Sequence, residues 1–280
     1  VAAAAWGDPY TPVDDGQDLL TLPRDVLATR DAIATLRREL MADPQNAELA
    51  SRVAAQYLEL GKTDGDPRFY GYAQAALAPW WESDSAPPDI LKTRAKLKEK
   101  AHRYDDALVD LQLALHQQPH DAQALVELGN IYRVQGKYTE ALAVADTLDE
   151  FAGAVPTALA RAPIMAVTGQ AERAYDLLSS VLPQARENYP GVIQWIHTVQ
   201  ADVSRALGRD AQAEEHFRTG LASDPGDTYL LRAFADYLLD RNRADEALPL
   251  VVDHVSDNGV LLRAAIAAHR TGDVQRATAW

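Results

Sequence analysis

Apolar residues recur at intervals of three and four along most of the chain, the pattern of helices that bury one face. Segments of about a dozen residues with this pattern alternate with short turns that contain Gly or Pro. For residues 24–280 we therefore predict an all-α fold of antiparallel helix pairs. Residues 1–23 lack the pattern, and we predict an extended N-terminal segment there.

The helical pattern repeats with a period of 34 residues. A unit of this length is one helical hairpin, which cannot bury its apolar face alone, so neighbouring hairpins must stack. Residues of the same kind stand one period apart in the pairs Tyr104 and Tyr138, Ala107 and Ala141, and Ala213 and Ala247.

Three kinds of residue are expected to shape each pair. Small residues let the paired helices approach closely, glycines in the left-handed conformation end the first helix, and prolines stop the second. The small residues are Ala107, Ala141, Ala174, Ala213 and Ala247; the glycines are Gly61, Gly136, Gly169 and Gly208; the prolines are Pro44, Pro119 and Pro225.

Residues 125–141, "LVELGNIYRVQGKYTEA", resemble the tetratricopeptide repeat. The resemblance implies a right-handed α-solenoid of about six repeats over residues 24–280. We also expect the native polypeptide to continue beyond Trp280, because the repeat is interrupted there. The matching positions are Leu125, Leu128, Gly129, Tyr132, Gly136, Tyr138 and Ala141.

Two positions depart from that pattern. Arg94 and Arg161 stand where the family packs a leucine between helices. An unpaired charge buried at such a position is costly, so each arginine must reach solvent or find a carboxylate. We predict a structural ion pair at each position.

The stretch "GDPRFYGYAQAALAPWWES" contains a longer loop than the standard repeat and a group of aromatic residues. Asp66 reads as a helix cap, Pro67 as the first helical residue and Pro79 as the point where the helix kinks or stops. The segment is also similar to one in a group of bacterial tetratricopeptide proteins; this resemblance implies the fold and a bacterial source and does not indicate an activity. The aromatic patch is either a packed helix face or a surface that stacks a ligand, and it consists of Phe69, Tyr70, Trp80 and Trp81.

Composition excludes several kinds of chemistry. Lys and Arg number 27 against 41 Asp and Glu, a formal charge of −14 that repels phosphate backbones, so we predict no nucleic-acid partner. The chain has no cysteine, and its histidines lack metal-ligand spacing, so we predict no metal and no cofactor. No enzyme motif is complete and no apolar run reaches the length of a membrane span, so we predict neither catalysis nor a span.

The resemblance places the first helix of each pair on a concave face. In some co-chaperones of the family, Lys and Asn at such positions hold the carboxylate of a partner's tail, although Leu159 and Pro163 break that pattern here. The basic helix 90–103 is thus either an acidic-peptide groove or a solvated face that balances nearby carboxylates. The predicted groove residues are Lys92, Lys96, Asn130, Arg133, Asp202, Arg205, Tyr229, Arg232 and Asp236.

These features favour a non-enzymatic scaffold that binds a peptide or protein segment on the concave face. The alternatives are a structural subunit of a larger extracytoplasmic complex that self-associates through the solenoid ends, and a small-ligand receptor at the aromatic patch. Small residues in "VAAAAWGDPY" are typical of a signal-peptidase site, so we predict a periplasmic or secreted protein, with a cytoplasmic one as the alternative.

Overall fold

The computed structural model describes residues 24–63, 66–255 and 257–280, and the predicted segment 1–23 lies outside them. The described residues form α-helices and three short 3-10 helices, with no strand. The all-α prediction is confirmed. The α-helices are α1 (Arg24–Ala42), α2 (Ala47–Thr63), α3 (Arg68–Ala76), α4 (Pro88–Lys100), α5 (Tyr104–Gln117), α6 (Ala122–Val134), α7 (Tyr138–Asp149), α8 (Ala154–Val167), α9 (Ala171–Asn188), α10 (Ile193–Ala206), α11 (Asp210–Ser223), α12 (Thr228–Asp240), α13 (Ala244–Val251), α14 (Asn258–Arg270) and α15 (Val274–Ala279).

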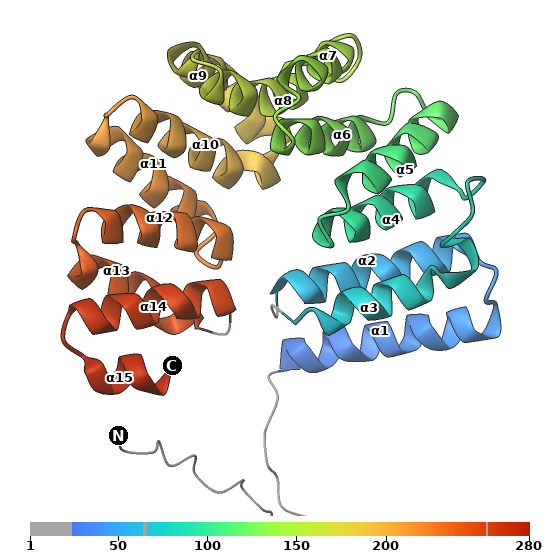
Figure 1. Ribbon diagram of the computed structural model, residues 1–280, viewed down its shortest axis with the longest axis horizontal. Helices are drawn as coiled ribbons and strands as arrows, with labels where there is room; N and C mark the ends of the chain where they lie inside the picture. The colour runs from blue at the N-terminus through green and yellow to red at the C-terminus, as the bar shows by residue number, and fades with distance from the viewer. Residues whose placement is uncertain (1–23, 64–65, 256) are drawn as a thin grey trace, which may run out of the picture.

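The helices after α1 are antiparallel pairs stacked into a right-handed solenoid, which rises through α6, turns at α7–α9 and descends to α15 (Figure 1). Most first helices of successive pairs pack against each other: α2 on α4, α6 on α8, α8 on α10 and α12 on α14. No two second helices pack comparably in the part of the chain that the structure describes. The stack therefore curves toward its first helices, which form the concave face, while the second helices spread apart on the convex face.

The turns within pairs share one backbone conformation. Residues with positive φ stand at 34-residue intervals at His102 (57°) and Gly136 (73°), and again at Gly208 (70°) and Asn242 (58°). Gly169 has a φ of 84°, as predicted. This conformation lets the chain reverse directly after the first helix.

The prediction for Gly61 is wrong. It lies inside α2 without a positive φ, because the longer loop that follows lets this helix continue to Thr63. Glycine is needed there for a different reason: a Cβ atom at this position would lie 2.5 Å from Cε1 of Tyr70. Glycine is therefore needed at position 61 because the Tyr70 ring lies close to its backbone, and not because of a positive φ.

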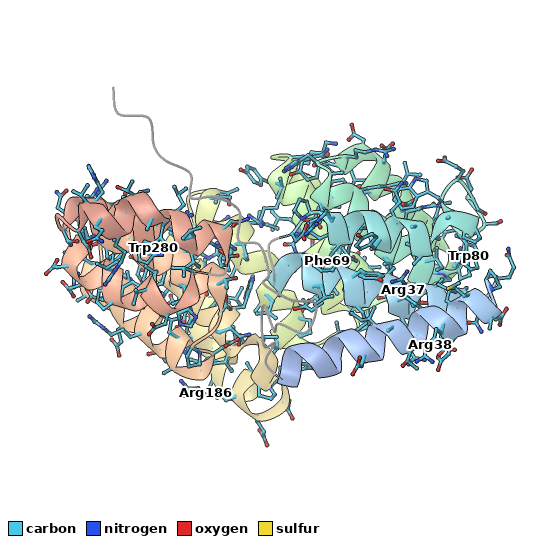
Figure 2. All side chains as sticks on the ribbon, turned by 90° about the horizontal axis from the view of Figure 1, so that it is seen from below. Arg37, Arg38, Phe69, Trp80, Arg186 and Trp280 are labelled. Carbon is cyan, nitrogen blue, oxygen red and sulfur yellow. The ribbon has the colours of Figure 1, made fainter. Side chains whose placement is uncertain are left out.

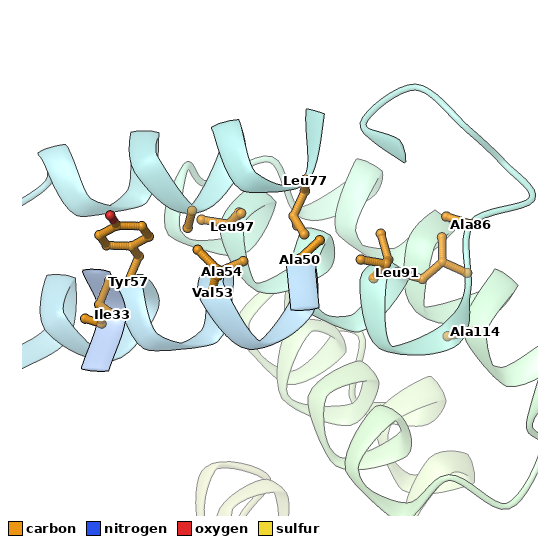
Figure 3. Close-up of a cluster of buried hydrophobic side chains, with 12 residues drawn as sticks. Ile33, Ala50, Val53, Ala54, Tyr57, Leu77, Ala86, Leu91, Leu97 and Ala114 are labelled. Atoms are coloured by element: carbon orange, nitrogen blue, oxygen red, sulfur yellow. The ribbon is translucent and has the colours of Figure 1, made fainter. Parts of the chain in front are cut away.

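The core is divided among several clusters along the stack. The N-terminal cluster joins α1 to α5 through residues such as Tyr57, Leu77 and Leu91 (Figure 3). The alanine expected in each second helix is buried, from Ala107 to Ala247, which confirms the close-packing prediction. Each cluster spans only neighbouring pairs, as in other solenoids.

Gly61→Ala should lower the free energy of unfolding by about 1–3 kcal/mol, since the Tyr70 ring packs on the N-terminal cluster and cannot move without losing contacts. Gly71→Ala in α3 is the matched control, because a Cβ there meets nothing within 4 Å. The control should be neutral or stabilise by up to ~1 kcal/mol through helix propensity. Urea unfolding measures both, and equal effects would contradict the close-approach explanation.

Candidate partner-binding face

The predicted groove residues lie on four of the first helices. Lys92 and Lys96 are on α4, Asn130 and Arg133 on α6, and Asp202 and Arg205 on α10. The remaining three are on α12. Ion pairs link the residues of α4 to the start and middle of α6, and those of α12 to Asp257 and α14, whereas Asp202 and Arg205 of α10 pair only with each other among the described residues. We treat the residues of α4 and α6 as the first group and those of α10 and α12 as the second.

Both lysines of α4 are paired with carboxylates. Nζ of Lys92 lies 2.7 Å from Oδ2 of Asp121 and 3.0 Å from Oδ1 of Asp89. Although burial opposes it, hydrogen bonds to these two carboxylates raise the pKa of Lys92. Lys96 Nζ lies 2.9 Å from Oε1 of Glu127. The charge of this basic helix is therefore balanced to a large extent within the chain.

Asp121 has a second role that fixes the start of α6. Its Oδ1 accepts a hydrogen bond from the backbone N–H of Ala124 at 3.0 Å, which is an N-cap. Asp227 and Asp257 cap α12 and α14 in the same way. The Lys92–Asp121 contact thus ties the middle of one first helix to the start of the next.

Polar atoms on α6 are left without partners. Nε of Arg133 and Oε2 of Glu127 are both buried and have no hydrogen-bond partner among the described residues. Burial also raises the pKa of Glu127, against the effect of Lys96. Asn130 is exposed on the same helix. This first group therefore combines satisfied lysines with an arginine that pairs with no described carboxylate.

The second group has mixed charge and an exposed aromatic ring. Arg263 on α14 donates to both oxygens of Asp236, at 3.0 and 2.6 Å. Arg205 lies 3.4 Å from Asp202, whose pKa is raised by burial despite this neighbour. Arg232 is 4.0 Å from Asp257. Tyr229 is 60% exposed, so it offers a ring to a partner without loss of internal packing.

The four predicted aromatic residues are separated along one hairpin. Phe69 stacks on Tyr57 with ring centroids 6.1 Å apart, at the start of α3. Trp80 and Trp81 lie beyond its other end, where Pro79 sits in a 3-10 turn, Ala78–Trp80, as the sequence indicated. All four side chains are partly buried and pack on the N-terminal cluster.

The predicted ion pair of Arg94 is confirmed. Its guanidinium donates to Asp110 at 2.9 and 2.6 Å, and both side chains are buried. The remaining nitrogen donates to the backbone carbonyls of Trp80, Trp81 and Ser83. The network therefore anchors the segment after α3 to both helices of the next pair.

Lys98 and Arg161 also pair with carboxylates of second helices. Lys98 adds a second cation to the buried carboxylate, with its Nζ 2.7 Å from Oδ2 of Asp110. Arg161, the other arginine at a leucine position, pairs with Asp146 at 2.5 Å in a partly exposed setting. Both departures from the repeat are therefore satisfied by carboxylates from second helices.

Sequence reasoning missed a histidine pair in which His197 is buried and His216 is half-buried. Nδ1 of His197 on α10 lies 3.2 Å from Nδ1 of His216 on α11, and Nε2 of His216 lies 3.0 Å from the hydroxyl of Tyr175. Burial, with His216 and Arg186 nearby, lowers the pKa of His197 to about 4. Burial also lowers the pKa of His216. A spacing of 19 residues has no meaning until the α10–α11 hairpin brings the rings together.

The described residues hold neither a metal-binding cluster nor a membrane-spanning helix. No group of three or more His, Cys, Asp or Glu side chains is placed to hold a metal ion. No helix in residues 24–63, 66–255 or 257–280 is long and apolar enough to cross a bilayer.

Comparisons with known proteins confirm the resemblance seen in the sequence. Residues 92–156 match the family model described as tetratricopeptide repeat. A tetratricopeptide repeat protein from Parabacteroides merdae is 16% identical with a TM-score of 0.61, and the match covers 87% of this chain and 93% of that one. Yeast Tom70 is 13% identical with a TM-score of 0.60, covering 89% and 60%. These two likenesses concern the fold alone.

One curated relative is similar over most of the chain. The cellulose synthase operon protein C of Xanthomonas axonopodis pv. citri is 26% identical over 272 residues. The match covers 86% of this chain and 18% of the relative, so the chain corresponds to a small part of that protein.

Asp110→Ala should lower the free energy of unfolding by about 3–5 kcal/mol, because it leaves the buried Arg94 and the partly buried Lys98 without their carboxylate. Asp146→Ala is the control, since its carboxylate is 72% exposed and removing an exposed pair costs at most about 1 kcal/mol. Urea unfolding of both variants measures the difference. Losses of similar size would refute the anchoring role of Asp110.

His197 should make the fold sensitive to acid. The pKa of His197 in the folded chain is about 4, below its ordinary value of 6.5. Between pH 6.5 and 4 the His197 imidazole is therefore protonated in the unfolded chain but neutral in the folded chain. Stability from this group is therefore lost as the pH falls from 6.5 toward 4, by on the order of 3 kcal/mol.

The test compares urea unfolding of the native chain and His197→Gln at pH 7, 5.5 and 4. The variant should lose less stability on acidification than the native chain. His116→Gln, at an exposed histidine of α5, should keep the native pH dependence. Parallel curves for the native chain and His197→Gln would rule out this contribution.

Proposed function

Because the chain is built from tetratricopeptide repeats, we propose that it is a non-enzymatic scaffold that binds an extended segment of a partner protein on its concave face. A solenoid offers a long open surface to another chain. The observation that carries the proposal is the set of side chains on the first helices that find no internal partner, above all Arg133.

Arg133 defines the chemistry of the first contact. Arg133 is partly exposed and makes no ion pair with a described carboxylate, so a carboxylate from a partner can form a charge-assisted hydrogen bond with the accessible part of its guanidinium. Asn130 lies one turn earlier on α6 and can add a neutral contact. The next first helix, α8, offers Leu159 and Pro163, which are partly buried and apolar. We infer a partner segment in which an acidic residue is followed by apolar ones.

The second group of residues suits a segment of mixed charge. Arg205 makes only a long contact with Asp202, so its guanidinium is available to a partner carboxylate. Tyr229 offers an exposed ring that can cover an apolar side chain. The alternation of sign along α10 and α12 favours a peptide over a uniform polyanion.

A second proposal comes from the Xanthomonas relative. Its name places it in a cellulose synthase operon, and the similarity extends over most of this chain. We propose that this chain is a scaffold within an assembly that includes a polysaccharide synthase, located outside the cytoplasm. Cross-linking of the chain in its source cells, followed by mass spectrometry, should recover synthase subunits; their consistent absence would refute this second proposal.

The concave-face proposal is tested with the partner segment found by that cross-linking, titrated onto purified variants. Arg133→Glu should weaken binding about tenfold or more, since each tenfold step is about 1.4 kcal/mol and a charge-assisted contact is lost. Tyr229→Ala should weaken it by a smaller factor.

Arg173→Glu is the matched control, because Arg173 is exposed on the second helix α9. Its binding should equal that of the native chain. Circular dichroism confirms that each variant is folded. If Arg133→Glu and Tyr229→Ala both bind as the native chain does, the concave face is not the binding surface.

A further inference from the structure

An apolar groove lies between α1 and α3, and α2 forms its floor. It consists of two adjoining cavities of about 480 and 390 Å³, which share Arg37, Tyr57 and Tyr72. We call it the outer groove, because it lies on the convex side of the solenoid. Met41 at its edge is 77% exposed and Tyr72 is 53% exposed, so apolar side chains are left uncovered here. Its walls also include Ile33, Leu40 and Phe69.

The outer groove has an equivalent between α11 and α13. Arg218 of α11 lies seven residues before Pro225. Arg37 of α1 lies at the same distance before Pro44, and each arginine lines its groove. The residues of α11 and α12 therefore correspond one by one to those of α1 and α2. A difference between the two grooves can thus be assigned to individual side chains.

Smaller side chains make the outer groove wider. Its floor contains Val53, whereas the equivalent residue of α12 is Phe234. Its α3 wall contains Ala76 where the α13 wall has Leu250, each three residues after the buried alanine of its helix. The cavity between α11 and α13 has a volume of about 370 Å³, against 480 and 390 Å³ for the two cavities of the outer groove. The outer groove therefore has room for side chains of another molecule.

The outer groove also lacks the carboxylate that balances the equivalent arginine. Arg218 forms an ion pair with Glu214, one turn earlier on α11. The position of α1 that corresponds to Glu214 is occupied by the apolar Ile33. Figure 2 shows Arg37 on the side of α1 toward the hairpin of α2 and α3. The arginine of the outer groove thus lies at the groove without the carboxylate of its own helix.

A second carboxylate is missing in the same way. Glu246 lines the groove beside α13, and the equivalent residue of α3 is Tyr72, since each precedes the buried alanine of its helix. Arg37 makes no ion pair with any described residue, whereas Arg68 at the rim is held by Asp66. The outer groove therefore presents one uncompensated positive charge beside an apolar surface.

We propose that the outer groove binds an amphipathic α-helix of a partner protein, with its apolar face in the groove and an Asp or Glu against Arg37. The carboxylate takes the place that Glu214 has beside Arg218. The apolar side chains fill the space that Phe234 and Leu250 occupy in the other groove. This inference goes beyond the concave-face function and does not depend on it, since it concerns the opposite side of the solenoid.

The shape and chemistry of the groove favour a helix over an extended segment. From Ile33 to Met41 the groove follows α1 for about 12 Å at 1.5 Å per residue, a little more than two helical turns. All three walls are helices, whose backbone N–H and C=O groups are bonded within each helix. An extended segment would bury backbone groups that find no donor or acceptor there, whereas a helix satisfies its own backbone.

Photo-cross-linking in the source cells tests the occupant. Met41 of the full chain is replaced by the photoreactive amino acid benzoylphenylalanine, and mass spectrometry identifies the peptide joined to it. We expect a partner segment with apolar residues at intervals of three and four and an Asp or Glu among them. The matched control carries the same substitution at Val109, which is 52% exposed on α5 and lines neither groove. The control should not give that segment.

The same segment, made as a synthetic peptide and titrated onto purified chain, tests the ion pair. Arg37→Glu should weaken binding about tenfold or more, and a peptide with Lys in place of its acidic residue should bind Arg37→Glu better than the native chain. Arg38→Glu, on the outer side of α1 in Figure 2, should bind the original peptide as the native chain does. Val53→Phe with Ala76→Leu copies the narrower groove and should abolish binding. Circular dichroism confirms that each variant is folded.

Three results would overturn the proposal. The first is a cross-link from position 41 to a second copy of the chain or to the chain's own residues. The second is the same cross-linked products from positions 41 and 109. The third is a peptide that Arg37→Glu binds as tightly as the native chain does.

Discussion

The close packing of paired helices at a buried alanine is the constraint from which the shape of this protein follows. The small side chain lets two helices approach, and the turn residues with positive φ fix their reversal. Since only first helices then pack on one another, the stack must curve. Curvature creates two different surfaces: a concave face formed by the first helices, and a convex face on which the second helices stand apart.

The Arg94 network shows how this packing accommodates a charge at a leucine position. The guanidinium is surrounded by acceptors from Asp110 and from three backbone carbonyls, so every contact it loses with water is replaced. The charge of Arg161 is also compensated, but by the more exposed carboxylate of Asp146. The segment after α3 is thus held in place by an arginine at a position where the repeat has a leucine.

The sequence was sufficient to predict what is periodic. The helix pairs, the buried alanines and the turns at Gly136, Gly169 and Gly208 all follow from residue types that recur in register. Gly61 failed because its role depends on the Tyr70 ring, which an irregular loop brings into contact. That specific pairing was outside the reach of any periodic pattern.

The candidate binding face likewise has features that the sequence predicts and features that it does not. The helices that carry Lys92 and Lys96 could be placed from register, but their partners Asp121 and Glu127 could not, because they belong to the next first helix. The histidine pair had no signal at all, since the two residues are unrelated by the repeat. The place of a residue on its helix could be predicted from the sequence alone. Its charge partner on another helix could not, because that depends on how the helices pack.

The division of the core into clusters that span only neighbouring pairs has a mechanical consequence. Small changes in the angle between neighbouring helix pairs add up over the stack, while the contacts inside each pair remain intact. The curvature of the molecule can therefore adjust to the length of what it holds. A destabilising substitution between two helix pairs therefore weakens the stack at that point and leaves the distant pairs folded.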